Sequence, residues 1–87
     1  MKVNFNGELY QVVFTDHAKE RMALRIISED LVYFVLKNGR QIQKEKPNHY
    51  WVYGSVPKRR DNFICLSIAL ETPFLIVVTT LINWRPK

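Results

Sequence analysis

The 87-residue sequence has few of the residues with which small proteins form stabilising disulfides or bind metal ions. It contains one cysteine, Cys65, which cannot form an internal disulfide and lies within an apolar run. We therefore interpret Cys65 as a small buried thiol, and its lack of a partner favours a reducing, cytoplasmic location. Two histidines far apart in the chain and one cysteine do not make a metal-ligand set, so no metal or other cofactor is expected.

Long apolar runs are also missing. The longest, Phe74–Val78 with its extension to Ile82, is too short to cross a bilayer as a helix, and the first residues do not form a signal peptide. We therefore expect a soluble protein without membrane association. The sequence also lacks a glycine-rich phosphate loop, a carboxylate pair suited to a glycosidase and a convincing Ser/His/Asp order.

The composition indicates one folded, basic domain over residues 1–87. Hydrophobic residues make up 47% of the sequence and aromatic residues 13%, enough for a packed core. Lysine and arginine exceed the acidic residues by 13 to 8, which gives a net charge of +5. An excess of this kind favours polyanionic partners such as nucleic acid.

Hydrophobic periodicity predicts a short hairpin, two helices and then four strands. Asn6-Gly7 is a hairpin-turn signal, and Thr15 and Ser28 are N-cap residues for helices separated by a tight corner near Arg25. After Gly39 the period changes to two, which predicts strands at Arg40–Lys46, His49–Val56, Phe63–Leu70 and Phe74–Ile82. We expect an α+β fold with both helices on one face of a four-stranded antiparallel sheet. Its last strand, apolar on both faces, lies in the middle or meets a partner.

The first helix carries the most site-like pattern in the sequence. At helical spacing, Ala18, Met22 and Ile26 form an apolar stripe. A second stripe directly beside it holds His17, Arg21 and Arg25. Titratable and cationic side chains are thereby placed at the edge of the core instead of on the opposite, solvated face.

A family resemblance rests on the same region. The run His17-Ala18, Arg21-Met22, Arg25 and Ile27–Asp30, with the later Val77–Thr79, resembles the domain-of-unknown-function family numbered 4258. Many members of that family have glycine where this chain has Ile26. The resemblance implies a fold similar to the RelE/ParE-like toxins and small metal-free ribonucleases, with two helices followed by an antiparallel sheet.

Together, the stripe and the resemblance favour a metal-independent endoribonuclease of a toxin–antitoxin type. Such an enzyme needs a base to activate the 2′-hydroxyl, an acid for the leaving oxygen and cations for the phosphorane. A neutral His17 imidazole can act as the base. Arg21 and Arg25 can hold a phosphate through forked hydrogen bonds. We therefore take His17, Arg21 and Arg25 as the candidate catalytic residues.

Further along the chain, basic and aromatic residues are candidates for nucleic-acid binding. Lys58, Arg59 and Arg60 form the densest positive run and can bind the RNA backbone. Trp51 and Tyr53 alternate onto one face of a predicted strand and can stack on bases. The expected partners are RNA or the ribosome, with an antitoxin-like protein or a second copy on the apolar sheet face.

A non-enzymatic reading of the same residues stays open at this point. The His/Arg stripe can instead support the fold, with Arg21 and Arg25 paired to Glu20, Glu29 or Asp30 across the corner between the helices. The basic run can be a solvated hairpin tip, and the two aromatic residues can belong to the core. The alternative function is a small interaction module that binds RNA or forms a homodimer.

Overall fold

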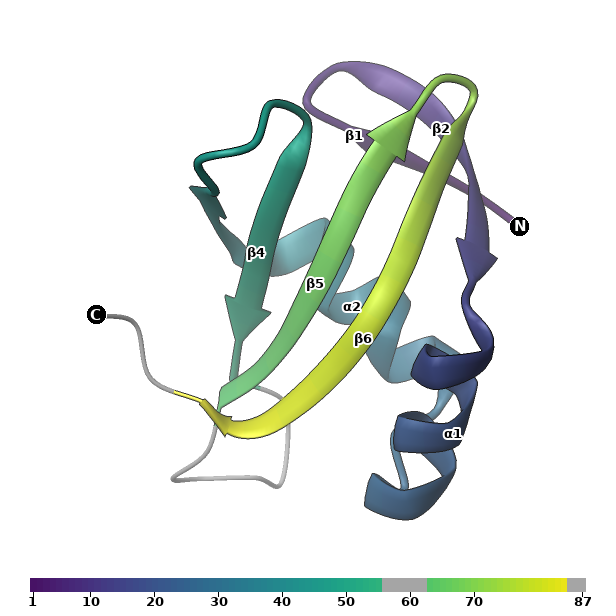
Figure 1. Ribbon diagram of the computed structural model, residues 1–87, viewed down its shortest axis with the longest axis vertical. Coiled ribbons are helices and arrows are strands. Elements are labelled where there is room, and N and C mark those ends of the chain that lie inside the picture. Colours follow the sequence, from purple (N-terminus) through teal and green to yellow (C-terminus); the bar gives the residue numbers. More distant parts are fainter. Residues whose placement is uncertain (56–62, 85–87) are drawn as a thin grey trace.

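A computed structural model describes residues 1–55 and 63–84. The elements, in chain order, are β1 (Lys2–Phe5), β2 (Glu8–Phe14), α1 (Asp16–Arg25), α2 (Glu29–Asn38), β3 (Arg40–Gln43), β4 (His49–Gly54), β5 (Phe63–Glu71) and β6 (Phe74–Trp84). All of these strands join one sheet (Figure 1).

The sheet corrects the predicted fold class. It has six strands in the order β1-β2-β6-β5-β4-β3 and is mixed, because β2 pairs parallel to β6 while the other neighbours pair antiparallel. The expected four-stranded antiparallel sheet is therefore wrong. The N-terminal hairpin is part of the sheet, since Gln11 to Phe14 lie beside Phe74 to Val77. As a result β6, the strand with two apolar faces, has a neighbour on each side.

The two helices begin and end where their caps predict. Thr15 accepts a hydrogen bond from the Ala18 backbone N–H at 3.0 Å, and Ser28 accepts one from Leu31 at 3.2 Å. Ile26 ends α1 in the left-handed conformation. That turn rotates its side chain away from the apolar stripe, so Ile26 is 82% exposed and the next residue, Ile27, is buried instead.

The sheet curls around α2. This helix contacts β1 near one edge of the sheet and also β4 and β5 on the other side, which a flat sheet would not allow. In Figure 1, α2 lies behind β4, β5 and β6, and α1 lies at the lower end of β6. The apolar core fills the space between α2 and the sheet, and includes Phe5, Val32, Val52, Leu66 and Leu75. We call the opposite face, which α2 does not cover, the outer face.

Candidate functional site

The N-terminus of α1 is anchored to β6 beyond the point where β2 ends. The Thr15 backbone N–H donates to Val77 O at 3.1 Å, and the Thr15 hydroxyl donates to Val78 O at 2.7 Å. Ala18 and Met22 then bury their side chains in the core. The helix therefore runs along a stretch of β6 that pairs with β5 on one side and has no strand on the other.

In this arrangement, Arg25 stabilises the contact between α1 and β6. Its guanidinium donates to the backbone oxygen of Thr80 in β6. Without a neighbouring strand on that side, the carbonyl needs another donor, and Arg25 supplies it. Arg25 thus differs from the other two residues of its stripe, because the fold itself uses its charge. This structural role differs from the alternative left open for Arg25, in which it pairs with acidic residues across the corner.

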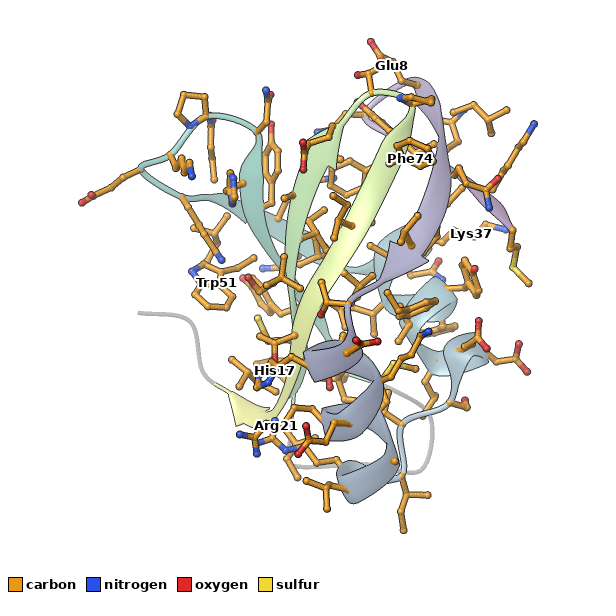
Figure 2. The ribbon with its side chains drawn as sticks, turned by 45° about the vertical axis from the view of Figure 1, so that its right-hand side comes forward. Glu8, His17, Arg21, Lys37, Trp51 and Phe74 are labelled. Carbon is orange, nitrogen blue, oxygen red and sulfur yellow. The ribbon has the colours of Figure 1, made fainter. Side chains whose placement is uncertain are left out.

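His17 and Arg21 are available to a ligand. His17 is exposed and Arg21 is half-buried. Figure 2 shows both side chains leaving α1 on the side of the molecule where Trp51 lies, whereas Lys37 points away on the far side. His17 and Arg21 therefore lie on the side of the molecule that carries Trp51.

The outer face carries a cation that the sequence analysis did not single out. Backbone pairing aligns Ile42, Trp51, Ser67 and Thr79 in one row across four strands. Lys44 follows β3, and its Nζ lies 3.8 Å from the centroid of the Trp51 ring and donates a hydrogen bond to Ser67 Oγ. Ser67 is itself buried. Lys44 is therefore held in one place by a cation–π contact and a buried hydroxyl.

The surroundings of Lys44 disfavour its charged form. Burial lowers the pKa of the Lys44 ammonium, and the neighbouring Cys65 thiol acts weakly in the opposite direction. The same surroundings raise the pKa of the Cys65 thiol to about 12 through burial, with Lys44 opposing the shift. Within residues 1–55 and 63–84, no carboxylate forms an ion pair with Lys44. A fixed, partly desolvated cation of this kind favours an anionic ligand.

The structure places the two aromatic residues that were predicted to stack on bases in different surroundings. Because Lys44 lies over the Trp51 ring, Trp51 supports the cation and does not offer that ring face to a base. Tyr53 is half-buried, and its ring meets that of Phe63 edge-to-face at 5.6 Å. The predicted basic run Lys58, Arg59 and Arg60 lies outside the described residues.

Lys44 and Ser67 escaped the sequence analysis for identifiable reasons. Lys44 lies in a segment whose polar alternation reads as a solvated edge strand, yet Ile42, two residues earlier, pairs with Trp51. Because residues two apart in a strand share a face, that pairing places Lys44 on the same face of the sheet as Trp51. Ser67 interrupts an apolar strand and points to the outer face, whereas its neighbours Leu66 and Ile68 point to the core. A serine in the middle of an apolar strand was the available signal.

Two further properties concern only the part of the chain that is described. There, no cluster of three or more His, Cys, Asp or Glu side chains could hold a metal ion. No helix in those residues is long and apolar enough to cross a membrane.

Comparison with known proteins gives one match. Residues 14–82 match the family model described as a domain of unknown function, DUF4258. The chain belongs to this family. The matched region of the DUF4258 domain begins just before the α1 cap and ends within β6, so it contains His17, Arg21, Lys44 and Ser67 and omits the N-terminal strand β1. No curated protein and no solved structure shows significant similarity to the chain.

Proposed function

We propose that this DUF4258 protein is an RNA-directed, toxin-like protein that binds RNA on the outer face of its sheet and cleaves it without a metal ion. The observation that carries the proposal is Lys44, a partly buried cation that is fixed over Trp51 by the Ser67 hydroxyl and forms no ion pair with a described residue. His17 and Arg21 project from α1 on the same side. The net charge of +5 supports a polyanionic ligand.

In this proposal each basic residue has a separate task. Arg21 binds the non-bridging oxygens of the phosphate that reacts and stabilises the charge that builds up on the phosphorane, and Lys44 binds a phosphate further along the strand. His17 takes the proton from the adjacent 2′-hydroxyl. The 2′-oxygen then bonds to phosphorus while the bond to the 5′-oxygen breaks, and water protonates the departing oxygen. The products are a 2′,3′-cyclic phosphate and a 5′-hydroxyl.

The experiment measures binding and cleavage of a labelled single-stranded RNA in EDTA. We compare the wild type with Lys44→Met, which keeps an unbranched chain over Trp51 but removes the charge. Lys37→Met is the matched control, because Lys37 is an exposed lysine on the far side of the molecule. Loss of one charge-assisted phosphate contact predicts affinity about tenfold lower for Lys44→Met and unchanged for Lys37→Met.

Salt dependence separates phosphate binding from a general loss of structure. Each phosphate contact on a single strand contributes about −0.7 to the slope of log affinity against log salt, so Lys44→Met makes the slope shallower by about that amount. His17→Ala leaves affinity near the wild-type value and abolishes the cyclic-phosphate product. Equal binding by the wild type and Lys44→Met overturns the proposed interface. RNA that binds but stays intact with the wild type overturns the cleavage step.

A further inference from the structure

A hollow lies beside the proposed RNA interface, where the end of α2 meets β3, β4 and the start of β5. Its volume is about 430 Å³, within the range of small-molecule sites. Its walls include three aromatic side chains and three polar ones: Phe34, Tyr53, Phe63, Asn38, Arg40 and Ser55.

Two glycines allow the walls of the hollow to approach one another closely. Gly39 follows α2, and a Cβ atom there would lie 2.5 Å from Val35 O and 2.6 Å from Tyr53 O. Gly54 ends β4 next to it, and its Cβ would lie 3.4 Å from the Gly39 Cα. The two backbones therefore pack directly against one another.

The lining suits a planar ring with a phosphate next to it. Phe34 is 39% exposed and lines the hollow together with Tyr53 and Phe63, whose rings meet edge-to-face. The Asn38 Nδ2 donates to Phe34 O at 3.0 Å, which leaves Asn38 Oδ1 as an acceptor. Arg40 is exposed at the rim and forms no ion pair with a described carboxylate.

The position of the hollow connects it to Lys44. Arg40 and Tyr53 are paired across β3 and β4, one step along the outer face from the pair Ile42 and Trp51. Arg40 and Lys44 are four residues apart on the same face, so their Cα atoms are separated by about 13 Å along the extended chain. A short stretch of extended RNA backbone spans that distance.

We infer that the hollow binds one unpaired nucleobase, stacked on its aromatic walls, with the attached phosphate at Arg40. The inference rests on the proposed function for its RNA, and it specifies the substrate class as single-stranded. In a duplex the base is already stacked and paired, so it cannot enter. The same base-and-phosphate chemistry could come from a free mononucleotide, and the experiment therefore tests both sources.

The experiment measures the affinity of wild type and Phe34→Ala for three ligands: a single-stranded RNA, the same RNA as a duplex, and AMP. Phe74→Ala is the matched control, since Phe74 is 43% exposed and lies at the opposite end of the sheet (Figure 2). We expect Phe34→Ala to weaken single-strand binding about tenfold, as loss of one stacked base predicts. Duplex binding stays unchanged, and Phe74→Ala behaves like the wild type.

The other outcomes overturn the inference in recognisable ways. If Phe34→Ala loses AMP binding but keeps its affinity for single-stranded RNA, the hollow is a mononucleotide site and its role in RNA binding is wrong. If Lys44→Met weakens RNA binding while Phe34→Ala changes the affinity for none of the three ligands, the proposed function is supported and the nucleobase site is wrong. If neither variant changes RNA binding, both fail. Thermal melting of each variant confirms that it is folded.

Discussion

Replacing Ile26 with glycine should stabilise the protein. Ile26 follows the last turn of α1 with φ 54° and ψ 50°, in the left-handed region that β-branched residues rarely occupy. The surrounding hydrogen bonds hold it there. Its N–H donates to Ala23 O at 3.4 Å, and the Ile27 N–H donates to Met22 O at 2.9 Å. This is a Schellman turn, which usually has glycine at that position.

The size of the effect follows from three contributions. The left-handed conformation costs a residue with a Cβ atom roughly 1–2 kcal/mol, and glycine removes that cost. The Ile26 side chain is 82% exposed, so its loss sacrifices little buried surface. Glycine also raises the conformational entropy of the unfolded chain, and this offsets about 0.4–1 kcal/mol of the gain in stability. The net gain is about 0.5–1 kcal/mol, or a rise in Tm of about 2–8 °C for a domain of this size.

Calorimetry or circular dichroism of wild type, Ile26→Gly and Ile26→Ala provides the assay. Alanine also removes the exposed apolar side chain, but it keeps the Cβ atom and most of the conformational cost. We therefore expect a clearly smaller rise in Tm for Ile26→Ala than for Ile26→Gly. A glycine variant that melts at or below the wild-type temperature would refute the reasoning, because the strain would then not reside at Ile26.

Three other predictions concern β5, β6 and the residues packed against them. Thr80→Val should stabilise by about 1 kcal/mol in urea unfolding, because the Thr80 hydroxyl is fully buried and has no hydrogen-bond partner among the residues that the structure describes. Arg25→Met should lower stability by about 1 kcal/mol, through loss of the hydrogen bond to Thr80 O, while RNA affinity changes less than in Lys44→Met. The Cys65 thiol, with its pKa raised from 9.0 to about 12, contributes stability that is complete below pH 9 and is lost as the pH rises from 9 toward 12. Urea midpoints at pH 8 and pH 10 should therefore fall more steeply for the wild type than for Cys65→Ala, and equal slopes would contradict that origin.

The helices and turns were predictable because their signals are local. Thr15 and Ser28 cap the two helices through their own hydroxyl groups, and Asn6-Gly7 adopts the positive φ values that a tight hairpin needs. Each signal acts over a few residues and survives in the folded chain. The helix corner near Arg25 followed from the same kind of reasoning.

The arrangement of the sheet was not predictable in this way. Parallel pairing joins Val12 to Leu75, which are far apart in the sequence, and no local pattern specifies that partner. Periodicity alone also placed Ile26 in the core, because it assumed that the helix continued in a regular way to that residue. The left-handed turn at Ile26 reverses the direction of its side chain.

The candidate site was predictable only in part, because it combines residues from separate elements. His17 and Arg21 follow from helix spacing alone. Lys44 can be recognised as a candidate only from the register of β3 and β4, which places it over Trp51 and beside Ser67 of β5. Arg25 looked equivalent to Arg21 in sequence, but the free backbone oxygen of Thr80 gives it a structural partner. Long-range register therefore decides which cations remain available.

The central claim is that Lys44 fixes an RNA phosphate on the outer face of the sheet. The most direct test is a fluorescence anisotropy titration of labelled single-stranded RNA, in EDTA and at several salt concentrations, with the wild type, Lys44→Met and Lys37→Met. If Lys44 binds a phosphate, Lys44→Met alone binds the RNA about tenfold more weakly. Its slope of log affinity against log salt concentration is also shallower by about 0.7. Superimposable curves for the three proteins would contradict it.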